Sequence, residues 1–82
     1  MKRTEIVDTV LETIQDNMGI DRANLTEATS QTDLGVDSIL MVDLMLALED
    51  RLNFSFKSLD MPKNPTIADI VSMIEKELAS TR

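Results

Sequence analysis

The feature that most constrains this chain is the run of residues 39–48, which is apolar at every position except Asp43. Together with its flanks, the run predicts a helix over residues 38–52, because large apolar side chains recur at helical spacing. Asp37 is its expected N-cap, and Asn53 can end it in a left-handed conformation. The side expected to face the core carries Met41, Leu44, Met45, Leu48 and Leu52.

The opposite side of this helix is also largely apolar, which is unusual for a surface helix. A domain of 82 residues rarely has an interior that can enclose one helix completely. Part of this side is therefore expected to be exposed and to bind a partner, with extra core packing as the alternative. The predicted partner-binding residues are Asp37, Ile39, Leu40, Asp43, Leu46, Ala47 and Asp50.

An amphipathic helix is predicted over residues 4–17, with Thr4 as its N-cap and Gly19 as its stop. Its apolar stripe consists of Ile6, Val7, Val10, Leu11 and Ile14. Its other face carries Glu5, Asp8, Glu12 and Asp16. We interpret these acidic residues as a solvated face, and an acidic docking surface is the alternative.

The last helix must begin after Pro62 and Pro65, because proline disfavours helical backbone at the residue before it. Thr66 is its expected cap, and Asp69 follows at capping-box spacing. The helix is predicted to run to about Ala79. Its apolar stripe consists of Ile67, Ile70, Val71, Ile74 and Leu78.

The connection over residues 19–37 is rich in Thr, Ser, Asn, Asp and Glu and shows no sustained periodicity. Loops longer than about 12–15 residues in compact domains are usually functional or disordered. We expect an ordered loop here, because apolar residues within it can pack against the helices. These anchors are Ile20, Leu25, Leu34 and Val36. A single helical turn is also predicted between Lys57 and Met61.

The composition favours an all-α fold. Hydrophobic residues make up 43% of the chain but include only two aromatics, Phe54 and Phe56, so aliphatic side chains and methionine must form the core. We expect residues 1–82 to form a single domain. The prediction is a small four-helix bundle with a long first loop. It consists of three main helices and one short turn of helix.

Several classes of function are disfavoured. The chain has no cysteine and no histidine, so it lacks thiolate metal ligands and the usual general base, and we expect neither an enzyme nor a metal site. A net charge of −7 argues against nucleic-acid binding and favours basic partners, although acidity can also serve solubility. No apolar segment reaches the length of a membrane span. We expect a cytoplasmic monomer.

The stretch Asp33-Leu34-Gly35-Val36-Asp37-Ser38 resembles the carrier-protein signature Asp-Leu-Gly-x-Asp-Ser, and Pro65-Thr66-Ile67 also fits that family. The resemblance implies that Ser38 carries a 4′-phosphopantetheine arm derived from coenzyme A. It further implies a phosphopantetheinyl transferase, a loading enzyme and synthase or transferase enzymes as partners. Acyl or aminoacyl groups are the implied cargo, held as thioesters on the arm.

One departure from the family pattern bears on the pathway. Fatty-acid-synthesis carriers usually continue with Leu-Asp-Thr-Val-Glu-Leu, whereas residues 39–44 read Ile-Leu-Met-Val-Asp-Leu, so that Leu40 replaces an acid. This favours a free-standing carrier of polyketide or nonribosomal peptide biosynthesis, with a fatty-acid-synthesis carrier as the alternative. An alternative from another class is a non-carrier helical adaptor, in which Ser38 is only a cap or a regulatory phosphosite.

Overall fold

Three long helices make up most of the chain in the computed structural model, which describes residues 2–57 and 61–80. They are α1 (Arg3–Met18), α3 (Ser38–Leu52) and α4 (Ile67–Ser80). Two short segments, η1 (Arg22–Asn24) and α2 (Gln31–Leu34), lie between α1 and α3. No strand occurs in the described part of the chain, and the all-α prediction is confirmed.

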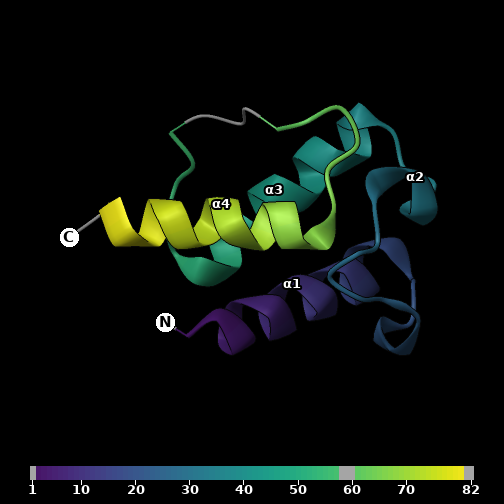
Figure 1. The fold of residues 1–82 in the computed structure, drawn as a ribbon, viewed down its shortest axis with the longest axis horizontal. Coiled ribbons are helices and arrows are strands. Elements are labelled where there is room, and N and C mark those ends of the chain that lie inside the picture. Colours follow the sequence, from purple (N-terminus) through teal and green to yellow (C-terminus); the bar gives the residue numbers. More distant parts are fainter. Residues whose placement is uncertain (1, 58–60, 81–82) are drawn as a thin grey trace.

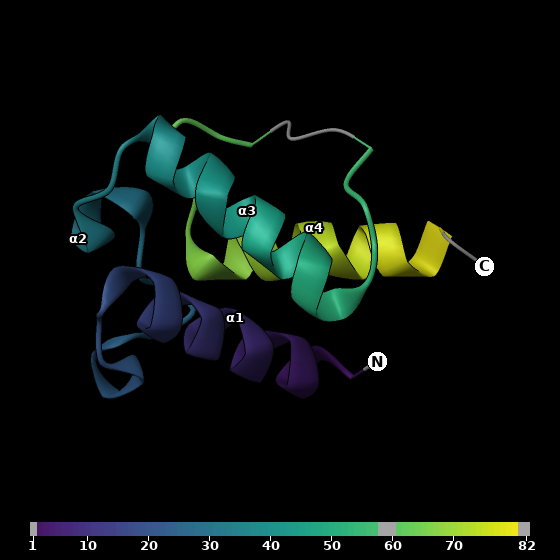
Figure 2. The same cartoon turned by 180° about the vertical axis from the view of Figure 1, so that it is seen from behind.

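The long helices surround a single core. Figure 1 shows α1 and α4 running in opposite directions, and α3 crosses them at an angle in both Figure 1 and Figure 2. The buried apolar side chains are Ile6, Val10, Ile14, Leu25, Met41, Leu44, Met45, Leu48, Ile67, Ile70, Val71 and Ile74. The three predicted stripes therefore meet as expected, while Val7, Leu11, Leu52 and Leu78 are only half-buried at the edge of the core.

The ends of α3 and α4 follow the predicted chemistry. The Leu40 amide donates to Asp37 Oδ1 at 2.9 Å, and Asn53 ends α3 with φ 54°. At the start of α4, the Asp69 amide donates to Thr66 Oγ1 at 3.2 Å, and the Thr66 amide donates to Asp69 Oδ2 at 2.9 Å. These contacts satisfy amides that have no partner within the helix.

The predicted N-cap of the first helix is wrong. The helix α1 begins at Arg3 with Lys2 in the cap position, so Thr4 lies inside its first turn. The Lys2 amide donates to Glu5 Oε1 at 3.1 Å, which stabilises this earlier start. Gly19 ends the helix with φ 68°, as predicted.

The long first loop is ordered by its own local structure. Leu25 is buried, and the other three anchors, Ile20, Leu34 and Val36, are half-buried against the core, as predicted. The short helix α2 within the loop was not predicted, although Ser30 and Asp33 form a capping box at its start. The turn predicted between Lys57 and Met61 includes residues 58–60, which lie outside the described residues.

Hydrogen bonds tie the first loop to the segment before α4. The Gln31 amide donates to the Pro65 carbonyl at 2.9 Å, and the Ile67 amide donates to the Thr29 carbonyl at 2.9 Å. Asn64 Oδ1 accepts from both the amide and the hydroxyl of Thr32, each at 2.9 Å. These bonds hold residues 64–67 beside the loop that leads into α3.

Candidate functional site

Ser38 is the first residue of α3 and is exposed. The cap is supplied by the Asp37 carboxylate, so the Ser38 side chain is not needed for that purpose. No described residue forms a hydrogen bond with the Ser38 hydroxyl. The turn that precedes it is held by Gly35, with φ 69°, and by the Gln31 side-chain amide, which donates to the Val36 carbonyl at 3.2 Å. A free hydroxyl therefore stands at the start of a well-supported helix.

The electrostatic setting of Ser38 is mixed. The N-terminus of α3 favours negative charge, since the first amides of a helix have no carbonyl partner within it. The Asp37 carboxylate lies directly beside it and offsets part of this effect. Asp37 forms no ion pair with any described residue, so no described cation is paired with the carboxylate at the helix start.

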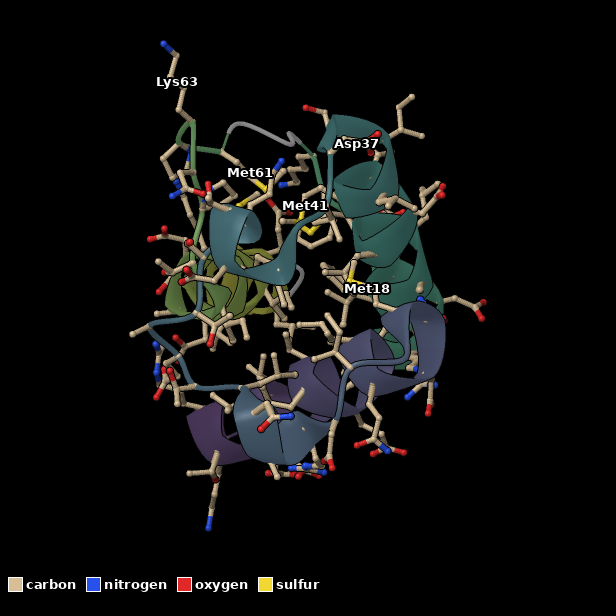
Figure 3. All side chains as sticks on the ribbon, turned by 90° about the vertical axis from the view of Figure 1, so that its right-hand side faces the viewer. Met18, Asp37, Met41, Met61 and Lys63 are labelled. Atoms are coloured by element: carbon tan, nitrogen blue, oxygen red, sulfur yellow. The ribbon has the colours of Figure 1, made fainter. Side chains whose placement is uncertain are left out.

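A hollow of about 330 Å³ adjoins Ser38, and we call it the Ser38 hollow. Ser38, Met41 and Val42 of α3 form one wall, and Gln31 of α2 forms another. The third wall consists of Met61, Pro62, Lys63 and Pro65. Figure 3 shows Met41 and Met61 in the space between α2, α3 and the segment that leads to α4. Polar and apolar surface contribute almost equally to the hollow, and Lys63 is the single cation in its walls.

A second hollow of about 290 Å³ lies on the other flank of α3, and we call it the α1–α3 hollow. Its lining comes from the end of α1, with Asn17 and Met18, and from Leu40, Asp43 and Leu44 of α3. The first half of α3 is thus flanked by a depression on each side.

The outer face of α3 is exposed at most of the predicted positions. Ile39 is 72% exposed, Leu46 is 54% exposed and Leu40 is 46% exposed, so these side chains do not provide extra core packing. Asp37, Asp43 and Asp50 are exposed as well, whereas Ala47 is half-buried. Val42 is 40% exposed and was not among the predicted residues. It mirrors Leu40 across the exposed arc, and this symmetry was readable from the helical spacing.

The acidic residues of α1 have partners within the chain. Asp8 forms an ion pair with Arg22, and Asp16 forms one with Arg51, which also lies 3.8 Å from Glu12. The hydrogen bond from Arg22 to Asp8, together with the negative charge of Asp8, raises the pKa of the guanidinium above its ordinary value. These pairs occupy much of the face for which acidic docking was the alternative.

Asp37, Asp43 and Asp50 on α3 differ, because none of them pairs with a cation among the described residues. The described part of the chain also contains no group of three or more carboxylates placed to share a metal ion. None of its helices combines the length and apolar character that a bilayer span requires.

Comparison with known proteins supports the motif. Residues 8–74 match the family model described as a phosphopantetheine attachment site. The acyl carrier protein of Thermotoga maritima is 39% identical over 77 residues, which cover 93% of this chain and 95% of that relative. An acyl carrier protein from an Exiguobacterium species is 30% identical over 79 residues, covering 95% of this chain and all of the relative. The chain therefore belongs to the acyl carrier protein family, whose cofactor is 4′-phosphopantetheine.

Proposed function

We propose that Ser38 is the residue to which the phosphopantetheine arm is attached and that residues 1–82 act as one carrier domain. The observation that carries this proposal is the exposed hydroxyl of Ser38, which is relieved of helix capping by Asp37. The residues around it suit the group: the helix start favours an added phosphate, and the lining of the adjoining Ser38 hollow combines one cation with polar and apolar side chains. The arm supplies a thiol, which the chain itself lacks.

Attachment requires a separate transferase. The Ser38 hydroxyl oxygen forms a bond to the β-phosphorus of coenzyme A, the phosphoanhydride bond breaks, and the adenosine bisphosphate part leaves. A base of the transferase takes the hydroxyl proton, because the carrier has no histidine or cysteine to accept it. Mg²⁺ is held mainly by the transferase. Asp37 uses Oδ1 for the cap, which leaves Oδ2 available to assist.

The outer face of α3 is proposed as the surface that partner enzymes recognise, with the monomeric carrier acting in the cytoplasm. Its centre is apolar, with Ile39, Leu40 and Leu46, and its acids Asp37, Asp43 and Asp50 have no cation partner among the described residues. A partner with an apolar patch rimmed by Lys or Arg complements this face. The rim charges govern encounter, and the apolar centre governs release. We add Val42 to the residues predicted from the sequence and place Ala47 at the margin.

For the pathway, we propose polyketide or nonribosomal peptide biosynthesis. The supporting observation is Leu40, which is 46% exposed at the position where fatty-acid-synthesis carriers usually have an acid. A carrier of fatty-acid synthesis is the second candidate, because both relatives are named acyl carrier proteins. The two candidates differ in kcat/KM with the malonyl transferase of fatty-acid synthesis. A high kcat/KM is expected only for a fatty-acid-synthesis carrier.

The experiment that tests the carrier function is intact-mass measurement of the unmodified protein after incubation with coenzyme A and a broad-specificity phosphopantetheinyl transferase. The expected result is a gain equal to one phosphopantetheine group, dependent on both reagents. A helical adaptor would gain nothing under the same conditions.

A further inference from the structure

The Ser38 hollow contains one positive charge, that of Lys63, which has no role in the attachment reaction described above. Lys63 lines it together with the uncharged polar residues Gln31 and Ser38, and no carboxylate lines it. All other lining residues are apolar. A site of this composition suits a ligand with one anionic group and a body that carries both polar and apolar parts, and it adjoins the hydroxyl that is proposed to become a phosphodiester.

Lys63 forms no ion pair with any described residue. This sets it apart from Arg3, Arg22 and Arg51, each of which pairs with acids of other segments. Figure 3 shows the Lys63 side chain extending into solvent from the segment before α4, so nothing fixes its ammonium group in place. Lys2, Lys57 and Lys76 likewise form no ion pair with any described residue, and Lys63 differs from them because it lines the Ser38 hollow.

The wall that carries Lys63 is bonded to α2 through the two residues that follow Lys63. Directly after Lys63 in the sequence, Asn64 Oδ1 accepts from Thr32, and the Pro65 carbonyl accepts from the Gln31 amide. The segment is therefore bonded to α2 before any ligand arrives. Gln31 donates its side-chain N–H to Val36, which leaves its Oε1 free to accept a hydrogen bond.

We propose, on the basis of the function proposed above, that Lys63 is a positioning residue that pairs with the phosphodiester on Ser38 and holds the arm against the Ser38 hollow. The phosphodiester places a second negative charge beside Asp37, and Lys63 is the cation available to balance it. The branched apolar part of pantetheine matches Met41, Val42 and Met61, and its amide N–H groups match the free Gln31 Oε1. The arm then exchanges between a held state and an extended state.

The pairing is exposed and therefore weak, which suits a carrier that must release its arm to each enzyme. Ion pairs of this kind change an equilibrium by up to about fivefold and are screened by salt. A partner enzyme with stronger phosphate contacts can draw the arm away without unfolding any part of the carrier.

The test compares apo and holo protein by ¹H–¹⁵N NMR, with the ³¹P signal of the phosphodiester as a second readout. The variant Lys63→Met removes the charge but retains an apolar stem, and Lys63→Arg restores a cation. Lys57→Met is the matched control, because Lys57 is equally a lysine of the α3–α4 connection and does not line the hollow. Apo spectra of all variants should overlay apart from the mutated site and its neighbours.

In the wild type, attachment of the arm should shift the amide signals of Gln31, Met61 and Asn64, and 1 M NaCl should reduce these shifts. The same reduction, up to about fivefold, is expected in Lys63→Met at low salt, but not in Lys63→Arg or Lys57→Met. Equal shifts in the wild type and Lys63→Met, or equal losses in Lys57→Met, would overturn the role of Lys63 while leaving Ser38 as the attachment site. A protein that gains no arm overturns both proposals, and the mass measurement distinguishes these cases.

Discussion

The polar face of α1 and the outer face of α3 are both acidic, but the chain treats them differently. Asp8, Glu12 and Asp16 on α1 are paired with Arg22 and Arg51. On α3, the acids lack cation partners among the described residues and alternate with exposed apolar side chains. Acidic residues thus serve two purposes here: those of α1 link neighbouring segments, whereas those of α3 are left for contacts outside the chain.

The largest effect that sharpens this comparison is the contrast between Leu44 and Leu46. Leu44 is fully buried and Leu46 is 54% exposed, although both belong to the same helix. Leu44→Ala should lower the free energy of unfolding by about 2–5 kcal/mol, because it leaves a cavity in the core. Leu46→Ala should change it by less than about 0.5 kcal/mol. Urea denaturation of both variants measures the difference, and equal losses would mean that the outer face is covered.

A smaller effect is expected from Leu40→Asp, which introduces the acid that fatty-acid-synthesis carriers usually have at this position. Because Leu40 is 46% exposed, the free energy of unfolding should change little. Loss of apolar contact should lower kcat/KM with the cognate loading enzyme by about tenfold. The burial free energy of one leucine side chain is large enough to account for this change. The kcat/KM with fatty-acid malonyl transferase should rise.

The control for this variant is its own thermal unfolding curve. An unfolded Leu40→Asp protein would show that Leu40 serves the core. A similar change in kcat/KM with both enzymes would show that the position does not discriminate between pathways.

Removing Arg51, the α3 cation that pairs with α1, should lower stability modestly and should affect no other property. Arg51→Met breaks the pairs with Asp16 and Glu12 while keeping an apolar stem. The free energy of unfolding should fall by about 0.2–1 kcal/mol at low salt, and the difference from wild type should shrink in 1 M NaCl. The rate of arm attachment should stay unchanged. A large loss of attachment would place α1 in the partner surface.

The smallest effect is expected from Asp43→Asn, with Asp16→Asn as the matched control on α1. Asp43 has no ion pair to lose among the described residues, so the free energy of unfolding of the Asp43→Asn variant should match that of the wild type. Its kcat/KM with a basic-faced partner should fall by about twofold at low salt, with no difference at high salt. Asp16→Asn should reduce stability instead and leave kcat/KM unchanged. The reverse pattern would contradict the division between the two faces.

Most features set by neighbouring residues were predictable from the sequence, although the N-cap of α1 was not, and the details of the site that depend on distant contacts could not be predicted. The Asp37 cap of α3 and the Thr66–Asp69 capping box depend on residues three positions apart, so the sequence pattern contained them. The Ser38 hollow depends on Asn64 meeting Thr32, which lies 32 positions away, and no local pattern could place Lys63 in its wall. Helix α2 is an intermediate case, because its capping box was legible but its length is only four residues.

Attachment of the arm at Ser38 is the central claim, and its most direct test is the intact mass of Ser38→Ala after incubation with coenzyme A and the transferase. Ser55→Ala is the matched control, because Ser55 is also exposed. Ser38→Ala should fold, since Asp37 supplies the cap, and should gain no mass. Ser55→Ala should gain one phosphopantetheine group, as the wild type does. A folded Ser38→Ala protein that gains the group at a comparable rate would contradict the assignment.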